Sequence, residues 1–302
     1  DGPRGTPSVD GKFVYALGAQ GNLVCVNAGD GTVVWQKSMQ DLGGGVPSWG
    51  YCESVLVDGD TVVCTPGGEK GAVVALNKGT GEIVWQSSDF LDSAQYASII
   101  AVDHNDTHQY IQLTMEHVVG LSADDGRILW QSDWPGQTAV IPTPIFRGGN
   151  VYVTSGYGVG CKLIHIDQND VVNDVYINKT MKNQHGGVVL VGDYLYGFSD
   201  GVGWLCQDFA SGKKVWGNKD ELGKGSLTYA DGRLYCLDMV SGAVAIIEAS
   251  PEGWKEHGRF TLEPQTTLRK PSGRIWTHPV VVDGRLYLRD QELLFCFDVK
   301  KR

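Results

Sequence analysis

The amino-acid sequence predicts an all-β protein, a β-propeller of four-stranded antiparallel blades, and two observations support this fold class. The first is a phrase of a glycine, three residues and a tryptophan, which recurs at residues 31–35, 81–85, 126–130 and 212–216. The second is that each phrase closes a unit of about 40 to 45 residues, the period expected of propeller blades. A unit of this size cannot bury both of its own faces, so copies of it must stack.

Each unit contains the strands that one blade needs. A short apolar strand leads into a turn at Asp-Gly or Gly-Asp, and a strand of alternating apolar and polar residues follows. Seven copies of this second strand are visible, at residues 13–15, 61–63, 109–111, 151–153, 194–196, 234–235 and 286–287. Third strands are predicted at residues 23–26, 73–76, 118–121, 163–166, 204–207, 244–247 and 293–297. The Gly-x-x-x-Trp phrase supplies the fourth strand.

The recurring tryptophan and glycine are both expected to be structural. A large flat ring on an outer strand can cover the apolar gap between adjacent blades, and it buries about 150 to 250 Å². The glycine supplies a turn position with positive φ.

Three units depart from the phrase. Unit four has Tyr176 in place of the tryptophan, unit six has Phe260, and unit seven ends at Val299 without a fourth strand. We therefore expect either seven blades, the last of three strands, or eight blades with the first upstream of Asp1.

Length and composition predict one domain, residues 1–302, of an ordinary globular kind. The chain is 42% hydrophobic and 20% charged, and no apolar run is long enough to span a bilayer. With 25 Lys and Arg against 35 Asp and Glu, the net charge is −10. Such a surface repels a phosphate backbone, so nucleic acid is not expected as a partner. The chain enters a strand almost at once, so we expect that a signal peptide was removed or that the true start lies upstream of Asp1.

The seven cysteines are an odd number, so at least one is unpaired. There is no C-x-x-C, no haem-attachment motif and no pair of adjacent cysteines. We expect those within strands, Cys25, Cys64, Cys206, Cys236 and Cys296, to be small buried hydrophobes.

The Ala/Lys-x-x-Gly-x-x-x-Trp phrase, with V-x-D-G hairpins ahead of it, resembles the PQQ-like repeat of quinoprotein alcohol dehydrogenase-like propellers. The resemblance runs from about Thr6 to Val299. The stretches at residues 185–196 and 223–235 are similar to bacterial PQQ-binding-like and polyvinyl-alcohol-dehydrogenase-like repeat proteins. This resemblance implies a bacterial protein that is periplasmic or secreted to the outside of the cell.

The resemblance also raises pyrroloquinoline quinone (PQQ) with calcium as a cofactor. PQQ alcohol dehydrogenases hold the quinone between a tryptophan and a disulfide of two adjacent cysteines, and a Ca²⁺ ion polarises it. Adjacent cysteines are absent here, and no grouping of acidic and amide residues marks a calcium site. The histidines show no metal-binding spacing, so we expect no metal.

A row of charged and aromatic residues precedes the inner strands, where a propeller's channel opens. The row stands six, seven or eight residues before successive hairpin glycines, and two long connectors, 41–51 and 263–276, join it. Long loops on a rigid scaffold commonly carry binding residues. The predicted ligand-binding residues at this channel mouth are Arg4, Trp49, Tyr51, Glu53, His185, Lys224, Arg274, Trp276 and His278. The alternative is that these polar side chains merely face a water-filled channel.

Two functions follow from these observations. The first is a non-catalytic binding or assembly scaffold that docks a protein, peptide or glycan at the channel mouth. The alternative is a PQQ-dependent dehydrogenase of an alcohol or sugar. In that case Trp49 or Trp276 would stack on the quinone, while Arg4, Lys224 and Arg274 would meet its carboxylates. No catalytic residue can be assigned from the sequence, and it leaves the oligomeric state open.

Overall fold

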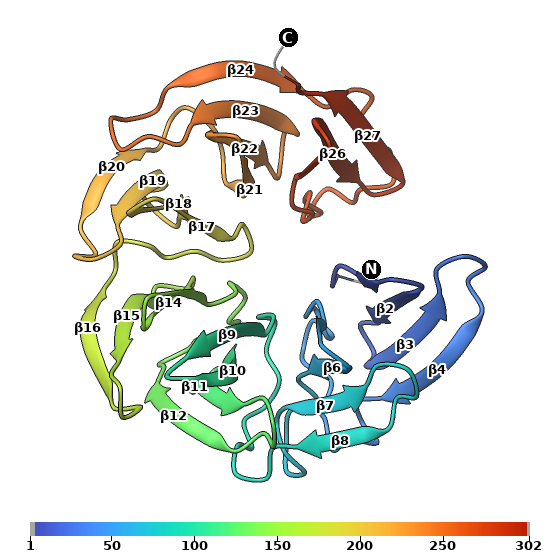
Figure 1. The fold of residues 1–302 in the computed structure, drawn as a ribbon. Helices are drawn as coiled ribbons and strands as arrows, with labels where there is room; N and C mark the ends of the chain where they lie inside the picture. The colour runs from blue at the N-terminus through green and yellow to red at the C-terminus, as the bar shows by residue number, and fades with distance from the viewer. Residues whose placement is uncertain (1–3, 301–302) are drawn as a thin grey trace. The chain divides into compact units, whose positions relative to one another are not determined.

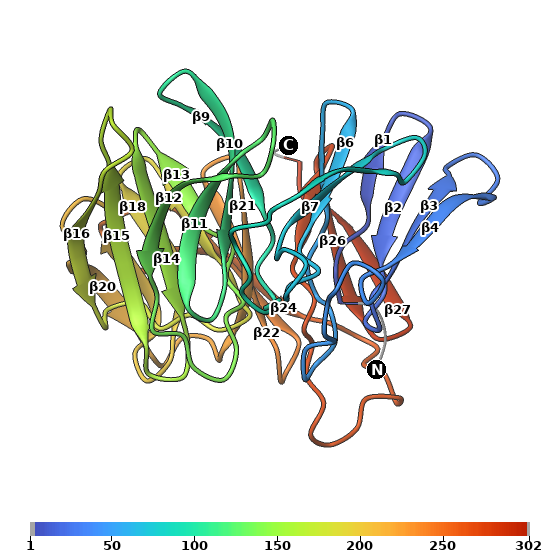
Figure 2. The same cartoon turned by 90° about the horizontal axis from the view of Figure 1, so that it is seen from below.

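The computed structural model describes residues 4–300, which form strands and turns and no helix. No membrane-spanning helix is therefore found in that range. The strands make seven antiparallel sheets, each with its strands in chain order. This confirms the predicted β-propeller, with each sheet a blade. Strands of one sheet, such as β9 to β12, lie side by side in both views (Figures 1 and 2).

The chain divides into two compact units. Unit one holds residues up to Val153 together with Lys162–Val175. Its first sheet is β1 (Ser8–Asp10), β2 (Phe13–Leu17), β3 (Asn22–Asn27) and β4 (Val33–Ser38). The second is β5 (Leu56–Asp58), β6 (Thr61–Cys64), β7 (Val74–Asn77) and β8 (Ile83–Gln86). The third is β9 (Ile100–His104), β10 (Thr107–Leu113), β11 (His117–Ser122) and β12 (Ile128–Asp133).

Unit two holds Thr154–Cys161 and the residues from Tyr176 on. The fifth sheet is β17 (Val188–Val191), β18 (Tyr194–Ser199), β19 (Gly203–Asp208) and β20 (Lys214–Asn218). The sixth is β21 (Gly225–Ala230), β22 (Arg233–Asp238), β23 (Ala243–Glu248) and β24 (Glu256–Thr261). The seventh has only β25 (Val280–Val282), β26 (Arg285–Asp290) and β27 (Leu293–Asp298), as the sequence predicted.

The fourth sheet supplies residues to both units. It consists of β13 (Ile145–Arg147), β14 (Asn150–Ser155), β15 (Gly160–Ile166) and β16 (Val172–Asn178). The predicted substitutes for tryptophan lie on outer strands, Tyr176 in β16 and Phe260 in β24.

A β-bulge lies at the same place in each of the four sheets that carry the Gly-x-x-x-Trp phrase. In the first sheet Cys25 pairs with Trp35 but Val26 pairs with Val33, so one residue before the tryptophan has no partner opposite it. The same shift precedes Trp85, Trp130 and Trp216. A bulge bends its strand and turns the following side chain, so it sets the direction of the tryptophan ring.

Three of the tryptophans reach the last turn of the next sheet. The Trp35 indole N–H donates to the carbonyl of Lys78 at 2.9 Å, in the β7–β8 turn. Trp85 and Trp216 donate to the carbonyls of Ala123 and Ser250, each at 2.9 Å. These bonds satisfy the polar atom of a ring that is otherwise packed between sheets.

The phrase glycine lies directly under the ring of the preceding sheet. A Cβ built on Gly81 would stand 2.7 Å from a ring carbon of Trp35, and one on Gly126 would stand 2.4 Å from Trp85. Tyr176 makes the same contact with Gly212, at 2.7 Å, and its hydroxyl donates to the Phe209 carbonyl at 3.0 Å. The glycine is therefore required for close approach as well as for positive φ.

Trp130 differs from these three tryptophans in the partner of its indole N–H. Its N–H donates to Gln109 of its own sheet at 2.6 Å. The turn of the fourth sheet has Asp170 at positive φ and no glycine. That turn is held by Asn105, whose amide donates to the Asp167 carbonyl at 2.8 Å and to the Asp170 carboxylate at 3.0 Å.

The cysteines are all free. Cys25, Cys64, Cys206 and Cys236 are buried, as predicted. Cys296 is exposed, contrary to the prediction, because β27 is the last strand of its sheet and no outer strand covers it.

Replacing Gly81 by alanine should destabilise the protein more than replacing Gly31. Both glycines have φ of +73°, but nothing lies within 4 Å of a Cβ on Gly31. Gly31→Ala should cost roughly 1–2 kcal/mol for the left-handed backbone alone, and Gly81→Ala should cost roughly 1–3 kcal/mol more because of overpacking. Urea unfolding measures both. In a Trp35→Ala background the excess cost of Gly81→Ala should disappear; equal costs in the wild-type background would contradict this account.

Candidate functional site

The predicted site residues occupy the segments that enter the first strand of a sheet. In an antiparallel sheet this entry shares one end with the hairpin between the second and third strands, because chain direction alternates. We call it the connector end. Arg4, Trp49, Tyr51 and Glu53 belong to unit one; His185, Lys224, Arg274, Trp276 and His278 belong to unit two. The shared channel mouth stays a prediction, and each group has its own geometry.

In unit one, Trp49 is the exposed aromatic residue of the predicted set. Its side chain is 48% exposed, and its ring packs edge-on against Tyr96 at 5.9 Å. The Arg4 guanidinium donates a hydrogen bond to the Trp49 carbonyl. These contacts bring Arg4 and Trp49 together at the surface of the β4–β5 connector.

Tyr51 lies in the core and not on a surface. It is 1% exposed, and its hydroxyl donates to the Pro66 carbonyl at 2.8 Å and lies 3.2 Å from that of Gly45. Burial raises the pKa of the phenol. The residue anchors its glycine-rich connector, so we leave it out of any docking surface.

Glu53 is also buried, at 2% exposure, and this gives its carboxyl group unusual properties. One oxygen accepts the Thr65 backbone N–H at 3.0 Å, and the other has no hydrogen-bond partner among residues 4–300. Desolvation raises the pKa of Glu53 to about 8, although the hydrogen bonds from Thr65 oppose that shift. The group is therefore mainly protonated at neutral pH.

In unit two, His185, Trp276 and His278 form one cluster. The His185 and Trp276 rings meet edge to face at 4.5 Å, and Trp276 is 53% exposed. The His278 Nε2 atom lies 2.7 Å from the His185 carbonyl. Both His185 ring nitrogens are buried without hydrogen-bond partners in the described chain. Desolvation, then the charges of Lys224 and His278, lower the pKa of His185 to about 3, so its imidazole is neutral.

His278 differs from His185 in its exposure. His278 is exposed, but desolvation of its ring by the surrounding protein lowers the pKa of His278. The hydrogen bond to the His185 carbonyl opposes that shift.

Lys224 lies beside this cluster in an ion pair. Its ammonium group is 2.6 Å from the Asp200 carboxylate and also donates to the Gln184 side chain. The Gln184 amide in turn donates to the Tyr157 hydroxyl at 2.5 Å. Asp200 and Tyr157 lie in hairpins between second and third strands, which the sequence analysis did not include. The alternation of strand direction could have placed them at the connector end.

Arg274 stays within its own loop. Its guanidinium donates to the carbonyls of Gly273, at 2.7 Å, and Pro271, at 3.3 Å. Neither bond reaches the His185 and Trp276 rings.

The residues present do not fit the predicted quinone. All seven cysteines are free, and no two are adjacent in the sequence. Of the cations meant for the quinone carboxylates, Lys224 is paired with Asp200 and Arg274 with loop carbonyls. Arg4 belongs to the other unit and bonds the Trp49 carbonyl. We therefore derive no step through PQQ.

Comparison with known proteins identifies the family. Residues 1–248 match the PQQ_2 family, described as outer membrane protein assembly factor BamB. The chain belongs to this family. That membership confirms the resemblance carried by the repeat. The match includes His185 and Lys224 and ends before Arg274, Trp276 and His278. No curated protein matches the chain.

Solved structures of similar fold include BamB from Moraxella catarrhalis. It has a TM-score of 0.69 at 17% identity, over 97% of this chain and 81% of that one. A europium-containing methanol dehydrogenase has a TM-score of 0.62 at 10% identity, over 97% and 76%. At these identities the similarity shows the fold alone.

The buried Glu53 should make the protein progressively less stable as the pH rises from about 4 to about 8. The pKa of Glu53 is about 8 in the folded state and near 4.3 in a free chain. Between these two pH values the folded protein keeps a proton on Glu53 that the unfolded chain has lost. The free energy of unfolding should fall there by up to ~1.4 kcal/mol per pH unit. Glu53→Gln should remove this slope, measured by urea unfolding from pH 5 to 9.

The exposed Glu69 offers a matched control. Glu69→Gln should keep the wild-type slope. If Glu53→Gln also keeps it, the Glu53 carboxyl is not the group that titrates.

Proposed function

We propose that this chain is a single-domain, non-catalytic assembly scaffold that docks a protein partner on a face of unit two. The face consists of Trp276, His185, Lys224, Asp200 and Tyr157. The observation that carries the proposal is the half-exposed Trp276 ring, which packs edge-on at 4.5 Å against the half-buried His185, whose ring nitrogens are both buried. An immobilised aromatic side chain loses little conformational entropy when a partner covers it.

The surroundings of Trp276 support protein docking. Tyr157 adds a second aromatic side chain, 37% exposed, and the Lys224–Asp200 pair supplies charge beside it. Tryptophan and tyrosine dominate binding hot spots, and polar groups form the rim around them. Because the His185 imidazole is neutral, the centre of the face carries no charge that a partner would have to desolvate.

A protein partner is favoured over a glycan or a free peptide by family membership. The matching family is described as an assembly factor for outer membrane proteins. We extend that role to this chain and place it outside the cytoplasm, where such an assembly would occur. A β-propeller by itself hosts unrelated activities, so the proposal rests on the face and the family together.

Photo-crosslinking in the native cell tests the docking face. With a benzophenone amino acid at position 276, we expect one discrete crosslinked envelope protein. The same group at Leu294, which is 70% exposed in the same unit, should not give that product. Trp276→Ala should remove binding of the identified partner and shift the melting temperature by less than ~2 °C, since surface substitutions usually change stability little. Identical products at both positions, or none at 276, would overturn the proposal.

Cofactor titration tests the dehydrogenase alternative. Adding PQQ with Ca²⁺ to the purified protein should give no saturable quenching of tryptophan fluorescence and no reduction of a dye with alcohols. The physical reason is that Lys224 is already paired and adjacent cysteines are absent. Saturable quenching with turnover would contradict the non-catalytic scaffold.

A further inference from the structure

We propose that Asp92, Glu116 and His117 form a binding site for a divalent first-row metal ion, best suited to Zn²⁺. The site is at the connector end of the third sheet, within unit one. Asp92 comes from the β8–β9 connector, Glu116 from the β10–β11 hairpin, and His117 begins β11. This inference is independent of the proposed docking function.

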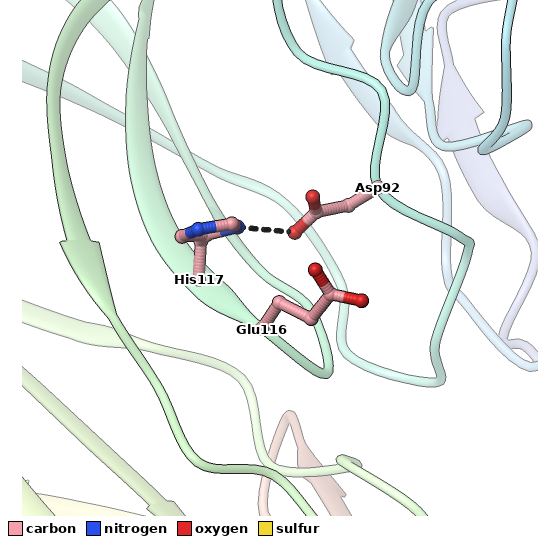
Figure 3. A group of neighbouring side chains, drawn as sticks. All are labelled: Asp92, Glu116 and His117. Atoms are coloured by element: carbon pink, nitrogen blue, oxygen red, sulfur yellow. Dashed lines mark hydrogen bonds and ion pairs between the residues drawn. The ribbon is translucent and has the colours of Figure 1, made fainter.

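The three side chains converge on one point. One ligand atom of each lies within 4.8 Å of those of the other two. The His117 Nδ1 atom is 2.8 Å from an Asp92 carboxylate oxygen, and Figure 3 shows the Glu116 carboxylate beside them. Ligands on tetrahedral zinc stand ~3.3 Å apart for bonds of 2.0–2.1 Å. Small side-chain movements therefore suffice to close the site around an ion.

The charge of the group also calls for a cation. Two carboxylates lie together, and repulsion between like charges at this distance is unfavourable without a counter-ion. The ion pairs of residues 4–300 give Asp92 only His117, and give Glu116 none. No lysine or arginine balances the pair within the described chain. Glu116 is exposed, yet its carboxylate lies beside Asp92 (Figure 3).

The surrounding residues hold the ligands in place. Thr114 is fully buried, and its hydroxyl donates a hydrogen bond to the Asp92 carboxylate. The same hydroxyl oxygen accepts the backbone N–H of His117 at 3.1 Å. The Glu116 carbonyl accepts the Trp134 N–H at 2.6 Å. The Phe90 ring packs edge-on against His117 at 6.5 Å. Such outer contacts orient metal ligands and lower the cost of binding.

The donor set selects the class of ion. Imidazole nitrogen with carboxylate oxygen suits zinc and neighbouring transition metals, whereas calcium and magnesium prefer oxygen alone. Three protein ligands leave at least one position for water, as in zinc sites that are open to solvent. The ion would take the place of the hydrogen bond that now joins His117 Nδ1 to Asp92.

The same sheet contains a matched control. His108 lies between two carboxylates, with Nε2 2.6 Å from Asp58 and Nδ1 2.6 Å from Asp103. The two carboxylates approach opposite nitrogens of one ring, so no ion could contact all three groups. His108→Gln therefore removes a histidine of the same kind without touching the proposed site.

Zinc titration of the chelator-treated full chain, followed by calorimetry and by the melting temperature, tests the site. We expect one ion per chain at the site and a melting temperature raised by several degrees, because the ion binds the folded state. Asp92→Asn, Glu116→Gln and His117→Gln should each weaken binding at least tenfold. His108→Gln should bind like the wild type, and so should Cys296→Ser, which removes the exposed thiol.

Glu116→Gln decides the result if the variants of the less exposed ligands fail to fold, because Glu116 is exposed. The proposal is overturned if Glu116→Gln binds zinc as the wild type does. It is equally overturned if His108→Gln or Cys296→Ser loses the same binding, or if the wild type takes up no zinc.

Discussion

At three of the junctions between sheets, an aromatic ring on one outer strand packs on a glycine in the last turn of the next sheet, and this contact constrains how those sheets stack. The ring covers the turn, its polar atom donates to a turn carbonyl, and the glycine leaves room for both. Each feature depends on the others, since a side chain on the glycine would displace the ring and its hydrogen bond. The bulge before the tryptophan belongs to the same device, because it directs the ring outward from its own sheet.

Stacking of this kind leaves the connector ends free to vary. The backbone of each sheet is held by its ladders and by the ring contacts, so the connectors need only span from one sheet to the next. In unit two they bring Trp276, His185 and Lys224 together from three separate connectors. In unit one a connector and a hairpin bring Asp92 to His117. Chemistry is therefore placed where the repeat imposes no residue.

The fold was predictable from the sequence because its signals are local. The Gly-x-x-x-Trp phrase and the hairpin turns each lie within a few residues, and they gave the seven sheets and the missing strand of the last one. The bulge was not predicted, since it depends on pairing between two strands. The different partner of Trp130 was not predicted either, because Gln109 lies on another strand of its sheet and outside the phrase.

The candidate site was less predictable because residue type does not determine burial. Tyr51 and Glu53 have polar groups, but the structure buries both, whereas Trp49 and Trp276 are half exposed. The sequence predicts Lys224 as a cation for a ligand, but Asp200, from a distant hairpin, pairs with it. The group of Asp92, Glu116 and His117 was missed for the same reason, because no spacing in the sequence connects its two segments.

The ring-on-glycine contact also bears on how such a protein can evolve. At three junctions the ring of one repeat requires a glycine in the next, so a duplicated or exchanged repeat is accepted there only if its turn suits the ring of its new neighbour. The junction between the third and fourth sheets uses a different solution, with Asn105 holding a turn that lacks the glycine. The turn of the sixth sheet that accepts the Trp216 N–H also lacks the contact, because nothing lies within 4 Å of a Cβ on Gly253. Repeats at these junctions are therefore not interchangeable with the others, and recombination within the gene would be tolerated at some boundaries and rejected at others.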